Sequence, residues 1–243
     1  DADAMLAADA IDRVQAAFAH NPDLAGVFGS YDDEPADPGI VSRFRNLLHH
    51  HTHVTHPGRA TTFWAGCGAI RTSIFFDVGG FDAGFASPSV EDIELGMRVV
   101  AAGGHIELDP GIRCKHLKRW TLASMIHTDI FSRAVPWTRL LMAAGHIPTT
   151  LNIDWRGRTS GGCVMAMVAS LALALWLPGA LAAGAACLAC VLLLNADFYR
   201  LCVQRGGVAF AGGAVVLHLL YYLYASLTFG FLTTGHRLRR LVP

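Results

Sequence analysis

The strongest constraint in this sequence is a stretch without any acidic or basic side chain, which covers residues 162–195. A straight helix of this length would extend about 50 Å, whereas the hydrocarbon core of a bilayer is only about 30 Å thick. Pro178 and Gly179 lie near its middle, so the pattern predicts a tight hairpin of two short helices. Another apolar block covers residues 208–234. Because one buried helix of a soluble protein cannot explain three apolar segments in succession, we expect a membrane region at 159–243.

Basic side chains flank the apolar segments and indicate their orientation. Positive residues beside membrane segments favour the cytoplasmic side, where anionic phosphates also lie. Arg200 and Arg205 follow the hairpin, and a basic group precedes it, so we expect the preceding chain to face the cytoplasm. A single crossing by residues 208–234 would place the basic run 236–240 outside, so that segment is kinked or re-entrant, or the tail breaks the rule. The preceding basic group comprises Arg113, Lys115, Lys118, Arg119, Arg133, Arg139, Arg156 and Arg158.

The chain before the membrane region alternates short apolar runs with amphipathic helical patterns, which predicts an α/β domain. Residues 122–145 form an amphipathic helical pattern broken at Pro136, which suits either the membrane interface or a helix packed on the soluble domain. The predicted division is 1–121, 122–158 and 159–243. Within the first part we expect helices at 4–20, 41–51 and 90–102, strands at 24–30, 61–69, 106–108 and 112–114, and a loop at 32–39.

The net charge, the cysteine spacing and the first residue bear on nucleic acid binding, on metal binding by cysteine and on the completeness of the domain. The formal net charge is zero, so we expect no nucleic acid partner, because that binding needs a basic excess. The six cysteines include no paired metal-binding motifs, and only Cys187 and Cys190 have C-x-x-C spacing. The chain begins with Asp1 rather than methionine, so we expect a fragment cut inside a domain.

Two acidic motifs precede the membrane region. Asp1 and Asp3 form a D-x-D pair, whose carboxylates can both face one cation if the backbone turns tightly after a strand. Hard oxygen ligands of this kind select Mg²⁺ or Mn²⁺. Glu91 and Asp92 stand at the start of the predicted helix 90–102, where a carboxylate can be either a cap or a catalytic base.

A third motif, His116-Leu117-Lys118-Arg119-Trp120, combines a guanidinium with an indole. The guanidinium of Arg119 can bind two phosphate oxygens, and the ring of Trp120 can stack on a sugar or a base. In isolation, the same residues are also typical of a basic patch beside a membrane.

The order of these motifs resembles that of the family-2 glycosyltransferases of GT-A fold, which is Rossmann-like. The resemblance is greatest to members with C-terminal membrane helices, the ceramide glucosyltransferase-like and cellulose synthase-like enzymes. Those enzymes carry D-x-D, an E-D pair, Q-x-x-R-W and then membrane segments. Further likeness lies in residues 63–69 (Phe-Trp-Ala-Gly-Cys-Gly-Ala), in 79–82 (Gly-Gly-Phe-Asp) and in the E-D-x-x-L-x-x-R pattern of residues 91–98. The resemblance covers roughly residues 1–121.

The resemblance implies an inverting transferase that moves a sugar from a nucleotide-sugar donor to a lipid or membrane-associated acceptor. Asp3, with Asp1, would hold the Mg²⁺ or Mn²⁺ that bridges the donor diphosphate. Asp92 would be the general base for the acceptor hydroxyl, and Glu91 would shape its surroundings. The donor diphosphate would contact Asp1, His116, Arg119 and Trp120, and the acceptor would approach Gly66, Cys67, Gly68 and Ala69.

The sequence departs from the family pattern at two points. His116 occupies the position of the glutamine, where it can contact the donor or approach the metal. The second departure is that the family's N-terminal nucleotide-binding half is not part of this sequence; we expect it upstream of Asp1 in a longer protein, and we expect this part not to bind donor by itself.

Other functions remain open at the level of sequence. A processive polysaccharide synthase would use the same motifs, although three segments are few for a polymer channel. A non-catalytic membrane adaptor on a degenerate transferase fold would not need Asp3 and Asp92 together. A metal sensor or transporter would use the run His49, His50, His51, His53 and His56, which otherwise suits a surface or acceptor-side packing role.

Overall fold

The computed structural model describes residues 3–85, 88–145, 151 and 154–241. The chain forms two compact units that divide between Thr121 and Leu122. The first unit is a mixed α/β structure with a curled sheet, and the second is helical and contains a long apolar C-terminal helix.

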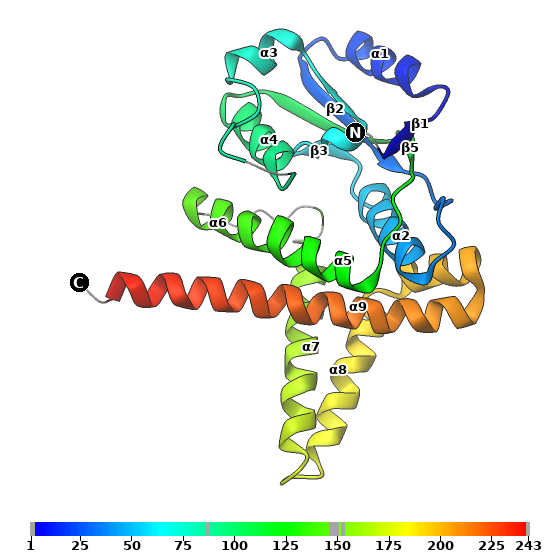
Figure 1. The fold of residues 1–243 in the computed structure, drawn as a ribbon, viewed down its shortest axis with the longest axis vertical. Helices are drawn as coiled ribbons and strands as arrows, with labels where there is room; N and C mark the ends of the chain where they lie inside the picture. Colours follow the sequence, from blue (N-terminus) through cyan, green and yellow to red (C-terminus); the bar gives the residue numbers. More distant parts are fainter. Residues whose placement is uncertain (1–2, 86–87, 146–150, 152–153, 242–243) are drawn as a thin grey trace. The chain divides into compact units, whose positions relative to one another are not determined.

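The sheet of the first unit is organised around one long strand, β5 (Figure 1). This strand runs parallel to β2 and antiparallel to both β1 and β3, while β4 pairs antiparallel with the other side of β2. All eight residues of β2 are buried, as a near-continuous apolar run predicts for a central strand. The strands are β1 (Ala4–Leu6), β2 (Leu24–Tyr31), β3 (Gly58–Ala60), β4 (Gly68–Ile70) and β5 (His105–His116).

Four α-helices accompany this sheet. Neighbouring residues of a strand point to opposite faces, and Val27 packs in a buried cluster with Ala10 of α1, whereas the Phe28 ring lies 5.6 Å from that of His53 in α2. The two helices therefore cover opposite faces of β2. The helices are α1 (Ala10–His20), α2 (Ile40–Val54), α3 (Thr72–Asp77) and α4 (Glu91–Ala101).

One glycine allows β2 and β5 to approach each other where their register shifts. The shift falls between Phe28 and Ser30, and a Cβ on Gly29 would lie 1.9 Å from the carbonyl oxygen of Ile112. Only a residue without a side chain fits this gap.

The structure confirms several predicted elements of the first unit and corrects others. The strand at 24–30, the loop at 32–39 and the helices at 41–51 and 90–102 are present, with slightly different ends. The helix at 4–20 is wrong at its start, because residues 4–6 pair with His116, Lys115 and Cys114 as strand β1. The strand at 61–69 is also wrong: this segment contains the 3₁₀ turn η1 (Ala65–Cys67) between β3 and β4. The strands at 106–108 and 112–114 are parts of the single strand β5.

The second unit begins with a continuous helical stretch rather than one broken at Pro136. Pro136, which has no N–H, is the second residue of α6 and directly follows the π-helical turn η2, where the regular i→i−4 hydrogen bonds are already interrupted. The stretch ends at Gly145, whose φ of 73° is left-handed. Its elements are α5 (Leu122–His127), η2 (Thr128–Ala134) and α6 (Val135–Ala144).

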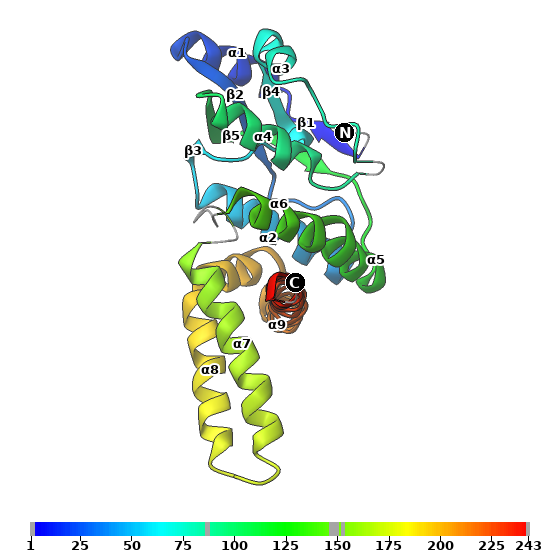
Figure 2. The same cartoon turned by 90° about the vertical axis from the view of Figure 1, so that its left-hand side faces the viewer.

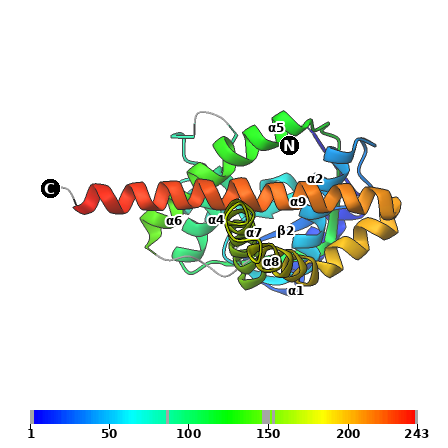
Figure 3. The ribbon, with the colours of Figure 1, turned by 90° about the horizontal axis from the view of Figure 1, so that it is seen from below.

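The predicted hairpin is confirmed as α7 (Trp155–Leu173) and α8 (Ala180–Leu194), which lie side by side (Figure 2, Figure 3). Pro178 and Gly179 lie in the turn between them. Asn195 links the hairpin to the last helix: its Nδ2 donates to Ser160 Oγ at 3.0 Å, and its Oδ1 accepts from Tyr222 at 3.0 Å.

The last helix, α9 (Ala196–Leu241), contains one non-helical residue, Gly207, at φ 77° and ψ 176°. Among the described residues, one helix is long and apolar enough to cross a membrane, Ala196–His236. The apolar helix α8 is shorter, about 22 Å at 1.5 Å per residue. The coarse prediction of an apolar helical region is thus confirmed, whereas the number of crossings and their orientation stay predictions.

The close approach at Gly29 gives a direct test of the sheet register. Gly29→Ala should destabilise the α/β unit by about 1–3 kcal/mol or more, because the new methyl group would collide with the backbone of β5. Thermal unfolding of the full chain in detergent would measure the loss. The control is Gly84→Ala, where the nearest atom is Oδ1 of the flexible Asp82 side chain at 3.1 Å. Equal stability of the two variants would contradict the register.

Candidate functional site

The two acids at the start of α4 have different partners. The Oε2 atom of Glu91 accepts a hydrogen bond from the backbone N–H of Ser89 at 2.7 Å, which ties the chain before α4 to the first residue of the helix. Asp92 Oδ1 accepts from the adjacent N–H of Ile93 at 2.8 Å, and its Oδ2 accepts from Ala65 N–H at 3.1 Å. Glu91 therefore holds the residues just before the helix, while Asp92 faces the segment that leads to β4.

The environment of Asp92 changes its acidity. Burial raises the pKa of Asp92 to about 6, and the negative charge of Glu91 adds to this effect. The hydrogen bonds from Ala65 and Ile93 oppose the rise but do not cancel it. A carboxyl group with a pKa near 6 is ionised at neutral pH and still basic enough to accept a proton, as a general base must be.

A glycine one turn further along α4 brings Ala65 to Asp92. A Cβ on Gly96 would lie 2.1 Å from the backbone nitrogen of Phe63, so helix and segment touch through their backbones. Residues four apart share one face of a helix, and Asp92 therefore lies over the same segment as Gly96. Gly96, within the pattern of residues 91–98, thus allows the close packing of α4 on the segment that contains Ala65.

The arginine at the end of that pattern holds the preceding loop. Arg98 pairs with Glu94 of its own helix, with Nε 2.6 Å from Oε1. Its two terminal nitrogens donate to the carbonyl oxygens of Val78 and Gly80. Arg98 therefore fixes the turn of residues 78–80 against α4.

Tyr31, at the end of β2, lies at the centre of an aromatic and histidine cluster. Its ring stacks on His116 at 4.3 Å between centroids and lies 4.4 Å from His49 and 4.8 Å from Trp64. Burial raises the pKa of Tyr31, and the charges of Asp3 and Asp92 raise it further. Both carboxylates therefore act on the same ring, although they are far apart in the sequence.

Asp3 and His116 lie beside each other because β1 pairs with the end of β5. The backbone N–H of Leu117 donates to the Asp3 carbonyl at 2.8 Å, and His116 Nε2 lies 3.8 Å from Asp3 Oδ2. Burial lowers the pKa of His116, although Asp3 favours its protonated form. Asp1, the other acid of the D-x-D pair, lies outside the described residues.

The rest of the third motif separates into a buried and an exposed residue. Trp120 is buried, its backbone N–H donates to Ser42 Oγ of α2 at 2.8 Å, and Lys118 lies 4.4 Å from its ring. Arg119 has an exposed side chain with Nε 3.8 Å from Asp37 Oδ2. Of His116, Arg119 and Trp120, the described residues predicted to contact the donor, His116 is thus the one that lies against Asp3.

The predicted acceptor segment is partly structural. A Cβ on Gly66 would collide with the Trp64 ring, and one on Gly68 would collide with the Phe63 ring, so the backbone folds closely over both aromatic residues. Cys67 is buried, and Ala69 pairs with Val27 in the sheet. Ala65, which supplies the N–H to Asp92, was not among the predicted residues.

Helix α2 contributes side chains that the motifs did not indicate. His50 and His53 place Nδ1 at 2.7 Å from the Tyr31 carbonyl oxygen and 2.8 Å from that of Gly29, which anchors the helix to β2. Arg45 lies 5.9 Å from the Trp120 ring, and its charge lowers the pKa of His116, after the larger effect of burial. The spacing of Ser42, Arg45 and His49 on one helical face was the available signal.

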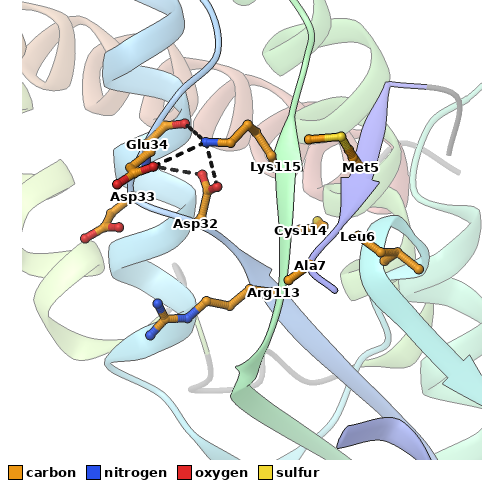
Figure 4. A pocket seen from close by; sticks show the side chains of 9 residues that line it. All are labelled: Met5, Leu6, Ala7, Asp32, Asp33, Glu34, Arg113, Cys114 and Lys115. Carbon is orange, nitrogen blue, oxygen red and sulfur yellow. Dashed lines mark hydrogen bonds and ion pairs between the residues drawn. The ribbon is translucent and has the colours of Figure 1, made fainter. Parts of the chain in front are cut away.

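An open pocket of about 310 Å³ lies elsewhere on the first unit, between β1, the end of β5 and residues 32–34 (Figure 4). Figure 4 shows Lys115 between two acids: its Nζ lies 2.8 Å from Asp32 Oδ2 and 3.7 Å from Glu34 Oε2. Because Asp92, Tyr31 and Trp64 do not line it, this pocket is not the site defined by the motifs.

No group of three or more histidine, cysteine or acidic side chains is arranged to hold a metal within residues 3–85, 88–145, 151 and 154–241. Asp3 offers one carboxylate, and Asp1, its predicted companion, lies outside these ranges. The oxygen chemistry of Asp3 suits Mg²⁺ or Mn²⁺. The magnesium or manganese ion therefore remains a prediction.

Comparison with known proteins assigns no relative to this chain: no protein-family model matches it, and a search of curated proteins finds no match. The fold and the site define a mixed α/β unit in which a carboxyl group of raised pKa adjoins an aromatic and histidine cluster.

The pKa of Asp92 gives a pH-dependent stability test. Its folded-state pKa of about 6 exceeds the ordinary value of 3.8, so the folded chain loses stability as the pH rises between these values and the carboxyl ionises. Asp92→Asn removes this loss and should stabilise the protein at pH 7 by about 1–3 kcal/mol. Chemical denaturation at pH 4 and pH 7 would measure it. A stability difference between variant and wild type that is the same at both pH values would contradict the burial of this charge.

Proposed function

We propose that this chain belongs to a metal-dependent, inverting family-2 glycosyltransferase of GT-A fold. It would transfer a sugar from a nucleotide-sugar donor to a lipid or membrane-associated acceptor. The observation that supports this most is that residues of all three motifs are linked through the rings of Tyr31 and Trp64: His116 stacks on Tyr31 and lies beside Asp3, and Asp92 accepts a hydrogen bond from Ala65, the residue after Trp64. An adaptor without catalytic activity would have no need for this convergence, nor for a buried carboxyl group with a pKa near 6.

Asp92 is the residue best suited to accept the proton of the attacking hydroxyl group. Its Oδ2 is positioned by Ala65, and its raised pKa matches it to proton transfer near neutral pH. As the acceptor oxygen attacks the anomeric carbon, its proton passes to Asp92. The bond from that carbon to the diphosphate oxygen breaks, and the electron pair leaves with the nucleoside diphosphate. Attack from the opposite face inverts the configuration.

Asp3 and His116 would form the donor side of the site. A divalent cation, when bound, offsets the charge that builds on the leaving diphosphate. Asp3, together with Asp1, would hold this cation through carboxylate oxygens. His116, which is buried between Tyr31 and Asp3, would orient the Asp3 carboxylate or contact the donor.

The apolar helices would hold the enzyme at its acceptor. Helix α9 has the length and composition to cross a bilayer, and the α7–α8 hairpin adds further apolar surface. The basic residues before the hairpin favour a multi-pass arrangement with the catalytic unit on the cytoplasmic side. A small number of crossings suits one transfer per binding event rather than a polymer channel.

The activity test uses the complete protein in nanodiscs with a panel of nucleotide sugars and lipids. Asp92→Asn should lower kcat by about 10²–10⁴-fold, the usual effect of losing a general base. Because the base must be ionised, kcat/KM of the wild type should rise with pH up to an apparent pKa near 6 and then level off. Transfer should need Mg²⁺ or Mn²⁺ and stop with EDTA.

The matched control for this test is Glu91→Gln. It changes the neighbouring acid but keeps an oxygen that can accept from the Ser89 N–H, so its effect on kcat should be much smaller. Full transfer by Asp92→Asn would show that the base is assigned wrongly. Transfer that persists in EDTA would exclude the metal.

A further inference from the structure

His49 of α2 differs from His50 and His53 in the hydrogen bonding of its Nδ1 atom. His50 and His53 both direct Nδ1 to carbonyl oxygens of β2. The Nδ1 atom of His49 is buried and makes no hydrogen bond to any residue that the structure describes. Buried polar atoms without partners are rare in folded proteins and call for an explanation.

The side chains packed against the ring of His49 are aromatic or histidine rings. Its ring centroid lies 4.0 Å from that of His53, 4.4 Å from Tyr31 and 4.5 Å from Trp64. Trp64 is partly exposed, and the next residue, Ala65, holds the Asp92 carboxylate. His49 and Trp64 therefore form an aromatic surface, packed on the ring of Tyr31, beside the proposed base.

The protonation of His49 decides which atom it can offer to a ligand. Burial lowers its pKa far below the ordinary value, and His53, Arg45, His116 and His50 lower it further, so the ring is neutral. A proton on Nδ1 would be a buried donor without an acceptor, which costs free energy. The proton therefore belongs on Nε2, at the ring edge of a side chain that is partly exposed.

We infer that His49 and Trp64, which are partly exposed and pack on the buried Tyr31 ring, form the surface that receives the acceptor, and that the acceptor's reacting hydroxyl belongs to a sugar ring. This inference rests on the proposed function. Within it, His49 Nε2–H would donate to a hydroxyl oxygen of that ring and direct another hydroxyl to Asp92. His49 would thus be a specificity-determining residue.

The chemistry of this aromatic surface favours a sugar ring over other acceptors. A pyranose has flat C–H faces that suit aromatic rings and an edge of hydroxyl groups that suits a neutral N–H donor. A fatty alcohol has only one hydroxyl, which Asp92 would already engage. A phosphate would require a cation in contact with it, whereas Arg45, one helical turn before His49, lies 5.9 Å from the Trp120 ring.

The test compares His49→Phe with His53→Phe in the complete protein. Phenylalanine keeps a ring at position 49 but removes both nitrogens. His49→Phe should raise the KM for hexyl β-glucoside about 3- to 10-fold, the effect of one lost hydrogen bond, and leave the KM for the donor unchanged. Its melting temperature should stay equal or rise, since no hydrogen bond is lost and a buried unpaired nitrogen disappears.

His53→Phe is the structural comparison. It leaves the Gly29 carbonyl without its partner and should lower the melting temperature. A loss of stability in His49→Phe as large as that in His53→Phe, or an unchanged KM for the glucoside, would overturn the inference.

Acceptors with matched tails separate this inference from the proposed function. Hexyl β-glucoside, hexanol and hexyl phosphate are supplied in turn, and binding is measured by calorimetry alongside transfer. Transfer to the glucoside, and weaker binding of it by His49→Phe, supports the inference. Preferred transfer to hexanol or hexyl phosphate overturns it but leaves a transferase. Binding of the glucoside without transfer to any acceptor rejects the proposed function but supports a sugar-binding role for the aromatic surface.

Discussion

The contact between the backbone of α4 and the backbone of residues 62–65 controls the geometry of the candidate site. It exists because Gly96 has no side chain, which lets the helix touch Phe63 directly. The same contact brings the N–H of Ala65 to Asp92 and places Trp64 beside it. A carboxyl group at a helix N-terminus is ordinarily stabilised in its charged form. Here, burial against this segment has the larger effect and raises its pKa.

Burial shifts the pKa values of the ionisable groups of the site toward their neutral forms. Burial raises the pKa of Asp92 and Tyr31 and lowers that of His49 and His116. All four shifts favour the neutral form, because a charge loses hydration when it is buried. At neutral pH, Tyr31, His49 and His116 are therefore uncharged, while Asp92 with its pKa near 6 carries a negative charge. A charged ligand at Asp3 would consequently act on these groups through a medium that screens it weakly.

The extent to which the sequence predicts this structure differs from element to element. The strand after Pro22, the helix that starts with Glu91 and the hairpin at Pro178 follow from local signals: a continuous apolar run, acids before an amphipathic pattern, and a turn between apolar segments. Strand β1 does not, because its three residues become a strand only by pairing with residues 114–116. The path of residues 61–69 depends on glycines packed over aromatic rings, which no periodicity reveals.

The same distinction applies to the site. The acids and His116 are visible as motifs, whereas the importance of His49 over His50 and His53 depends on which side of α2 meets β2. Asp3, in turn, precedes a three-residue edge strand whose Met5 and Leu6 side chains are about half exposed. Short exposed edges open locally more easily than a buried central strand. We therefore expect the contact between Asp3 and His116 to open more readily than the contacts among β2, α2 and α4, so that the donor-side carboxylate and the base are held by parts of the fold that differ in local stability.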